Sequence, residues 1–289
     1  MESQILTLAA ADWQSPGFDS RWVEAVEDGK VLYFPGMAFA LSDGEKALLR
    51  PDLLADGVRN ISLDAQGRLK GVAGDAVVQD SATALIARFS AHATGLVTSL
   101  FPDYAPHLRA APTSLRPAQV STREQSWRAD DRRLHVDAFP SRPNRGERIL
   151  RVFANINQQG EPRAWRVGEP FTDVARRFLP RAKPYSAVQA RLLRALRITK
   201  SLRSEYDHLM LQLHDGMKRD EGYQKDSPQQ AMDFPPGSAW VCFSDQTVHA
   251  AMGGQHMLEQ TFHLPVDRQY NREASPLAIL TRLAGHPLI

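Results

Sequence analysis

The 289-residue chain lacks, or nearly lacks, several features that are typical of particular classes of protein. It contains a single cysteine, Cys242, which excludes an internal disulfide and a zinc site built on several cysteines. No stretch approaches the roughly 18 uninterrupted apolar residues of a transmembrane helix. The N-terminus carries Glu2 where a signal peptide would be basic. We therefore expect a cytoplasmic protein, with peripheral contact to the cytoplasmic face of the inner membrane left open.

A strong charge of one sign is also missing. The chain has 35 Lys and Arg against 33 Asp and Glu, for a formal net charge of +2. Its overall electrostatics therefore indicates no nucleic-acid partner. Hydrophobic residues make up 43% of the sequence, which is typical of a soluble globular protein.

The main pattern in the sequence is a series of short predicted strands, interrupted by one long segment that lacks strand character. Alternating or continuous apolar runs predict strands at Lys30–Phe34, Leu115–Arg123, Arg148–Asn157, Arg163–Val167, Ala239–Phe243 and Gln260–Val266. Helical spacing predicts helices at Asp43–Leu54, capped by Ser42 and Glu45, at Ala76–Leu100 and at Glu205–Met217. This pattern predicts an α+β, mainly β fold: a double-stranded β-helix (a cupin-like jelly roll) with N-terminal helices packed against it.

The chain is expected to form one cooperative unit with three parts. Residues 1–112 form an N-terminal region of helices and strands packed on the barrel. Residues 113–270 form the catalytic core, interrupted by a basic helical insertion at about 172–230. Residues 271–289 are predicted to be a C-terminal tail.

Two short motifs indicate a metal site. His135 and Asp137 are two residues apart, so both side chains point the same way from an extended segment, and His249 follows a buried strand. Two histidines and one carboxylate, with the opposite face open, suit non-haem Fe(II) that activates dioxygen. Structural roles are the alternative: His249 as a half-buried residue at a strand end, and Asp137 as a turn residue near Arg133.

A cation on the following strand is a candidate for binding a cosubstrate. Arg151 follows Asp137 by 14 positions (151 − 137) and could hold the far carboxylate of a dicarboxylic acid in a bidentate contact. The alternative is a structural salt bridge with Glu124 or Glu259.

This set of residues resembles that of the Fe(II)/2-oxoglutarate-dependent dioxygenases, which carry a His-x-Asp…His triad on a double-stranded β-helix. The resemblance implies that His135, Asp137 and His249 bind iron and that 2-oxoglutarate and O2 are cosubstrates. Many members place a basic anchor for 2-oxoglutarate shortly after the second histidine, but Glu259–His263 contains no Lys or Arg. Arg151 is therefore the expected anchor, and Gln260 or Thr261 adds a hydrogen bond.

A closer resemblance is to the Kdo hydroxylases, which hydroxylate C3 of 3-deoxy-D-manno-oct-2-ulosonic acid (Kdo) in the inner core of lipopolysaccharide. The matching stretches are Gly29–Pro35, Asn60–Asp64, Leu134–Phe139, Arg151–Asn157, Trp240–Asp245 and Leu258–Phe262. The resemblance implies Kdo-lipid A as the substrate and decarboxylation of 2-oxoglutarate to succinate. The alternatives are a 2-oxoglutarate oxygenase acting on a protein, nucleic acid or metabolite, a non-catalytic jelly-roll protein that binds sugar or lipid, and a cupin-like isomerase.

A basic segment lies inside the predicted insertion. Residues 176–203 carry nine Lys or Arg and no Asp or Glu, and Arg191, Arg194 and Arg197 recur every third position beside leucines. This spacing predicts a basic amphipathic helix suited to an anionic membrane surface. The alternative is a solvated helix whose leucines pack on the barrel. Aromatic residues among these cations are few, so stacking on nucleic-acid bases is not indicated.

Overall fold

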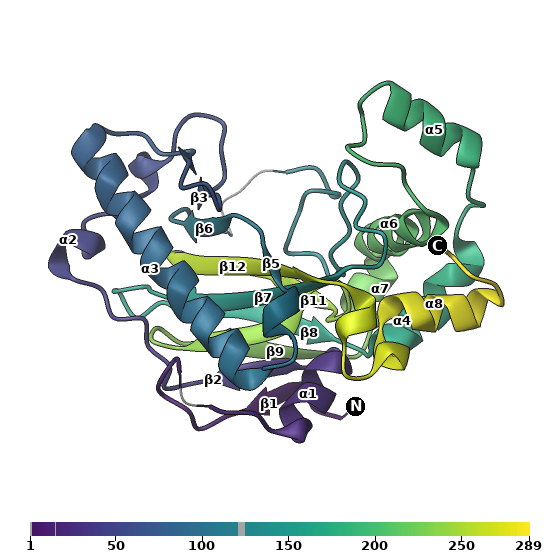
Figure 1. Ribbon diagram of the computed structural model, residues 1–289, viewed down its shortest axis with the longest axis horizontal. Coiled ribbons are helices and arrows are strands. Elements are labelled where there is room, and N and C mark those ends of the chain that lie inside the picture. Colours follow the sequence, from purple (N-terminus) through teal and green to yellow (C-terminus); the bar gives the residue numbers. More distant parts are fainter. Residues whose placement is uncertain (1, 15, 121–124) are drawn as a thin grey trace.

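Two β-sheets face each other in the computed structural model, which describes residues 2–14, 16–120 and 125–289 (Figure 1). Within these residues the main sheet has nine strands, in the spatial order β1 (Ile5–Thr7), β2 (Val31–Phe34), β10 (Ala239–Phe243), β7 (Arg148–Asn155), β12 (Met257–Leu264), β6 (Thr113–Arg116), β3 (Ile61–Leu63) and β4 (Leu69–Lys70), with β5 (Arg109–Ala110) paired to β12. The small sheet has the order β11 (His249–Ala251), β8 (Arg163–Gly168) and β9 (Gln229–Phe234). This arrangement is of the jelly-roll type and confirms the predicted fold class.

Aromatic side chains fill the space between the two sheets. Phe153 and Trp240 come from the main sheet, and Trp165 and Phe234 come from the small one. Trp240 stacks on Phe234 with ring centroids 4.2 Å apart and on Phe153 at 5.2 Å. Buried aromatic pairs of this kind contribute both apolar area and a preferred geometry, so they fix how one sheet lies on the other.

A long helix covers the opposite face of the main sheet. Helix α3 (Ala76–Leu100) begins where the Asp75 side chain accepts a hydrogen bond from the Val78 amide, and it has the predicted bounds. Its buried Leu85 and Phe89 belong to the same core as Val152 of β7. Helix α1 (Ser20–Glu27) contributes Val23 and Val26 to this core.

Helices also gather at one end of the sheets (Figure 1). They are α4 (Phe171–Phe178), α6 (Glu205–Arg219), α7 (Glu221–Asp226) and α8 (Pro276–Ala284). Residues 271–289, predicted to be a tail, therefore contain a helix, whose Ile279 and Leu280 are buried against α4 and α6. Among the described residues, no helix combines the length and apolar character needed to span a bilayer.

Helix α5 (Ala187–Ala195) stands apart from this cluster (Figure 1). Leu192 within this helix and Leu196 just after it are 56% and 60% exposed, so these two leucines do not pack on the barrel. The helix also ends at Ala195, before the last of the three regularly spaced arginines. Arg197 lies beyond the helix with φ of 55°, in the left-handed region that stops helical propagation.

Several predicted bounds need correction. The predicted helix from Asp43 to Leu54 is divided into α2 (Asp43–Lys46) and a 3-10 turn at Pro51–Leu53, because proline cannot continue a helix from the preceding turn. Its capping box of Ser42 and Glu45 is confirmed. Of the predicted strand 115–123, only the start lies in β6, and residues 121–123 lie outside the described residues. The last strand begins at Met257 rather than Gln260.

Candidate metal centre

A short backbone pairing brings the two distant histidines together. The His135 amide donates to the His249 carbonyl at 3.0 Å, and the His249 amide donates to the His135 carbonyl at 2.9 Å. The two residues are therefore direct partners in an antiparallel bridge, and their rings lie 4.6 Å apart. Gly168 of β8 lets this region pack closely, since a Cβ there would lie 2.4 Å from Val248 Cγ1.

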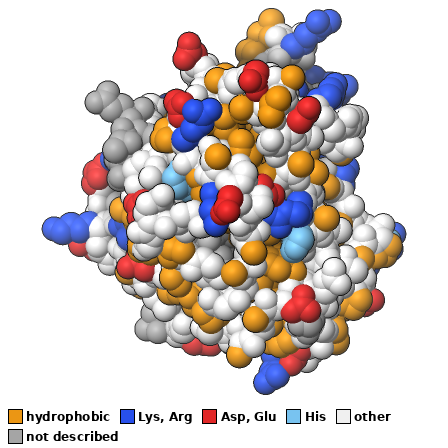
Figure 2. Space-filling view, turned by 90° about the vertical axis from the view of Figure 1, so that its left-hand side faces the viewer, with side chains coloured by type: hydrophobic (Ala, Val, Ile, Leu, Met, Phe, Trp, Pro, Cys, Tyr) orange, Lys and Arg blue, Asp and Glu red, His pale blue; other side chains and the backbone are white. Residues whose placement is uncertain are grey.

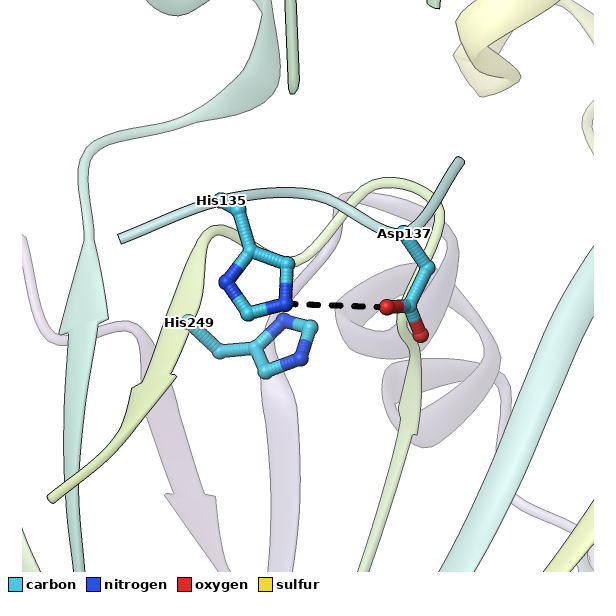
Figure 3. Close-up of side chains that lie close together, drawn as sticks. All are labelled: His135, Asp137 and His249. Carbon is cyan, nitrogen blue, oxygen red and sulfur yellow. Dashed lines mark ion pairs between the residues drawn. The ribbon is translucent and has the colours of Figure 1, made fainter. Parts of the chain in front are cut away.

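The carboxylate joins them from the same segment as the first histidine. The Asp137 amide donates to the Ser244 carbonyl at 2.8 Å, which holds the motif against the loop that follows β10. Asp137 Oδ1 lies 3.7 Å from His135 Nε2, as the dashed line in Figure 3 marks. One ligand atom from each of His135, Asp137 and His249 lies within 4.8 Å of the others. The three side chains converge as the sequence predicted.

Hydrogen bonds behind the imidazoles determine which nitrogen can bind a metal. His135 Nδ1 lies 2.7 Å from the Arg133 carbonyl, and His249 Nδ1 lies 2.9 Å from the Thr247 carbonyl. A carbonyl oxygen can only accept, so each Nδ1 carries the proton and each Nε2 keeps a lone pair. Metal-binding histidines are commonly oriented by such contacts.

The charges of the three groups fit a divalent cation. Burial is the largest influence on both histidines and lowers the pKa of His135 and of His249, which keeps the rings neutral. Burial alone would raise the pKa of Asp137, but Arg151, followed by His249 and His135, outweighs it and holds that pKa below its usual value. Two neutral imidazoles and one ionised carboxylate are a donor set that suits Fe(II).

Arg151 connects this triad to a second carboxylate. Its Nη2 lies 3.0 Å from Asp137 Oδ2, and its Nη1 lies 3.3 Å from Glu259 Oε1. Glu259 also lies 2.8 Å from Arg116 Nη2. The structural ion pair with Glu259 is thus present, whereas Glu124 lies outside the described residues. Among the described residues, Arg151 Nε is buried without a hydrogen-bond partner, so a ligand atom that accepts a hydrogen bond at this point would satisfy it.

A cavity of about 720 Å³ opens beside Arg151. Thr261, which faces Arg151 across the β7–β12 pair, lies in its wall, as does Phe139, two residues after Asp137. Arg151 therefore contacts the triad and also lines a space large enough for a small-molecule ligand.

The structure does not place Gln260 in this cavity. Its side chain lies on the opposite face of β12, where Oε1 accepts hydrogen bonds from Ser90 of α3, at 2.9 Å, and from Thr113. Its Nε2 donates to the Ala111 carbonyl at 3.0 Å. The side chain of Gln260 therefore lies away from the cavity in which we expected it to contact the cosubstrate, because successive residues of a strand point to opposite faces.

Two residues near the site were not predicted to act there. Trp165 stacks on His249 with centroids 5.1 Å apart and shields that ring. His263 lines the cavity with Thr261, and burial, followed by Arg109, lowers the pKa of His263 to about 4. The alternation along β12 would have identified His263, since Glu259, Thr261 and His263 share one face.

Comparison with known proteins identifies the family. Residues 10–287 match the family described as 3-deoxy-D-manno-oct-2-ulosonic acid (Kdo) hydroxylase. This chain belongs to the Kdo hydroxylase family. No curated protein matches the chain.

Crystal structures of one Kdo hydroxylase, KdoO, a non-haem Fe(II) alpha-ketoglutarate-dependent dioxygenase, are similar over almost the whole chain at 44% identity. The complex with alpha-ketoglutarate and Fe(III) has a TM-score of 0.94, with 99% of this chain and 97% of that chain covered. The cobalt(II) complex has a TM-score of 0.95, with coverages of 99% and 98%. This similarity confirms the predicted jelly-roll fold of a Kdo hydroxylase.

Removal of the carboxylate is expected to weaken metal binding. Asp137→Ala deletes one of three donors, so the affinity for Co(II) or Fe(II) should fall at least about tenfold. Anaerobic titration followed by visible absorption measures the affinity, and circular dichroism checks the fold. His208→Ala on α6, outside the triad, is the control and should bind normally. Unchanged affinity in Asp137→Ala would refute its role as a ligand.

Proposed function

We propose that this chain is an Fe(II)- and 2-oxoglutarate-dependent dioxygenase that hydroxylates Kdo at C3 in Kdo-lipid A. One observation carries the proposal: two neutral imidazoles and an ionised carboxylate converge beside a cavity, in a chain of the Kdo hydroxylase family. A non-catalytic binding protein would not need this donor set. The 44% identity to KdoO, a dioxygenase solved with alpha-ketoglutarate and with succinate, supports the same cosubstrate here.

In the proposed reaction, the metal and its cosubstrate supply the oxidation, and the residues of the chain bind and orient them. Bound iron with 2-oxoglutarate supplies the oxidation: O2 gives one oxygen atom to a C–H bond and one to succinate, with release of carbon dioxide. His135, Asp137 and His249 would hold the ion through three protein ligands, a set that suits Fe(II) and leaves room for further ligands. Arg151 holds Asp137 Oδ2, so that Oδ1 remains directed at the histidines. Trp165 packs on His249 and keeps water from that ring.

The reaction itself can be followed by the change in mass of the lipid substrate. Purified protein given Fe(II), 2-oxoglutarate, O2 and Kdo-lipid A should add one oxygen atom to Kdo and form an equal amount of succinate. Mass spectrometry of the lipid and assay of succinate measure the two products. Succinate formation that Kdo-lipid A does not stimulate, with no gain of oxygen on Kdo, would remove the sugar substrate and leave the iron chemistry in place.

Arg151 is proposed to bind the far carboxylate of 2-oxoglutarate, with Thr261 beside it. Its side chain is 14% exposed and lines the cavity, and its Nε lacks a partner among the described residues. Both Asp137 and Glu259 raise the pKa of Arg151 against the opposing effect of burial, so it stays charged. A guanidinium in this position can share its donors between Asp137 and a bound carboxylate.

Replacement of Arg151 tests this role. Arg151→Gln should raise the concentration of 2-oxoglutarate required for half-maximal rate by about tenfold or more, because a charge-assisted contact is lost. Arg151→Lys, which keeps the charge without the fork, should recover part of that loss. Steady-state kinetics at varied 2-oxoglutarate measures it. A lower melting temperature with an unchanged requirement for 2-oxoglutarate would assign Arg151 to structure alone.

Helix α5 is proposed to bring the enzyme to an anionic membrane surface. Val188, Leu192 and Leu196 are 75%, 56% and 60% exposed, and the exposed Arg191 and Arg194 lie between them. Hydrophobic and basic side chains also stand together at the top of Figure 2, the level at which Figure 1 places α5. Apolar side chains that enter the interface, flanked by cations, are typical of peripheral membrane helices.

Vesicle binding tests this contact. Neutralising Arg191, Arg194 and Arg197 to Gln should weaken binding to phosphatidylglycerol-containing vesicles by roughly a hundredfold, at about 1 kcal/mol per cation. Neutral phosphatidylcholine vesicles should bind both proteins weakly. Lys183, Lys225 and Arg272 changed to Gln provide a control of equal charge. Equal binding by the two triple variants would exclude α5 as the membrane contact.

A further inference from the structure

The cavity beside Arg151 is lined by six cationic side chains that fall into two groups. Three of them are neutralised by carboxylates. Arg68 lies 2.8 Å from Asp64, Arg109 lies 2.5 Å from Glu147, and Arg151 contacts the two acids described above. These three are balanced within the protein.

The other three cations are Lys70, Arg142 and Lys200. None of their side chains has an ion pair or a hydrogen bond with any residue in the described part of the chain. All three are exposed, so burial does not hold them in place. Their charge is therefore available to a ligand in the cavity.

Backbone contacts hold two of these cations in the same place. The Lys200 amide donates to the Ser141 carbonyl at 2.9 Å, and Ser201 Oγ donates to the Pro143 carbonyl at 3.3 Å. The segment after α5 is thus fastened on both sides of Arg142, in the loop that follows Asp137. The backbones of Arg142 and Lys200 are therefore held close together, so two cations without an acidic partner line the same part of the cavity, and a bound anion would offset their charge.

Lys70 reaches the cavity from a different part of the fold. It belongs to β4 at the edge of the main sheet, whereas Lys200 belongs to the insertion. The cavity therefore has unbalanced positive charge on two walls that are far apart in sequence. On the face that Figure 2 shows, by contrast, basic and acidic side chains are mixed.

We infer that Lys70, Arg142 and Lys200 form an anion subsite that binds a phosphate or carboxylate of the acceptor at a distance from the carbon that is hydroxylated. This inference rests on the proposed function for its substrate class. The subsite selects an acceptor with a second anionic group, and it holds the reacting sugar in place by a charge contact remote from the metal.

Equilibrium binding tests the subsite apart from turnover. The probe is a deacylated, water-soluble Kdo-lipid A fragment, titrated into protein that holds Co(II) and 2-oxoglutarate. Replacing Lys70, Arg142 and Lys200 by Ala should weaken binding at least about tenfold, since each partly exposed charge contact contributes a factor of about two to five. The control carries Lys183→Ala, Lys225→Ala and Arg272→Ala, which make the same change in net charge and should leave binding unchanged.

Two altered fragments distinguish the anionic groups. If a phosphate occupies the subsite, the dephosphorylated fragment should bind wild type and the triple variant equally. If a carboxylate occupies it, the methyl ester of the fragment should do so. Equal binding of the intact fragment by the wild type and the triple variant, or no binding by either, would overturn the subsite. Binding by wild type without hydroxylation in the iron form would instead refute the proposed function and leave the subsite standing.

Discussion

The two backbone hydrogen bonds between His135 and His249 are the constraint on which the centre depends. They fix the register between the segment before β7 and the start of β11. A shift of one residue would turn one imidazole to the opposite face, because side chains alternate along an extended chain. Asp137 follows from the same register, since it lies two residues after His135 and points the same way. The ligand geometry is thus a consequence of pairing between backbones.

Strand β12 separates the core from the site. Leu258, Gln260 and Phe262 face α3, whereas Glu259, Thr261 and His263 face the metal side or the cavity. One strand therefore supplies both apolar packing and polar lining. The polar exception on the core side, Gln260, is satisfied by Ser90, Thr113 and the Ala111 carbonyl, as a buried amide requires.

Elements with a strong local signal could be predicted from the sequence. The apolar spacing along the 25-residue helix α3, the buried run of β10 and the capping box at Ser42 all depend on residues that are close in sequence. The triad could also be predicted, because its residue types are specific. The orientation of Gln260 and the partners of Arg151 could not be derived in the same way, since they depend on which face of β7 and β12 meets α3. The residues that make those contacts are far apart in the sequence.

The ion pair between Arg151 and Asp137 has a consequence for the electrostatics of the metal centre. Arg151 offsets the charge of Asp137, and the carbonyl contacts orient both imidazoles, so the surrounding chain determines both the charge and the orientation of the donors that an ion would meet.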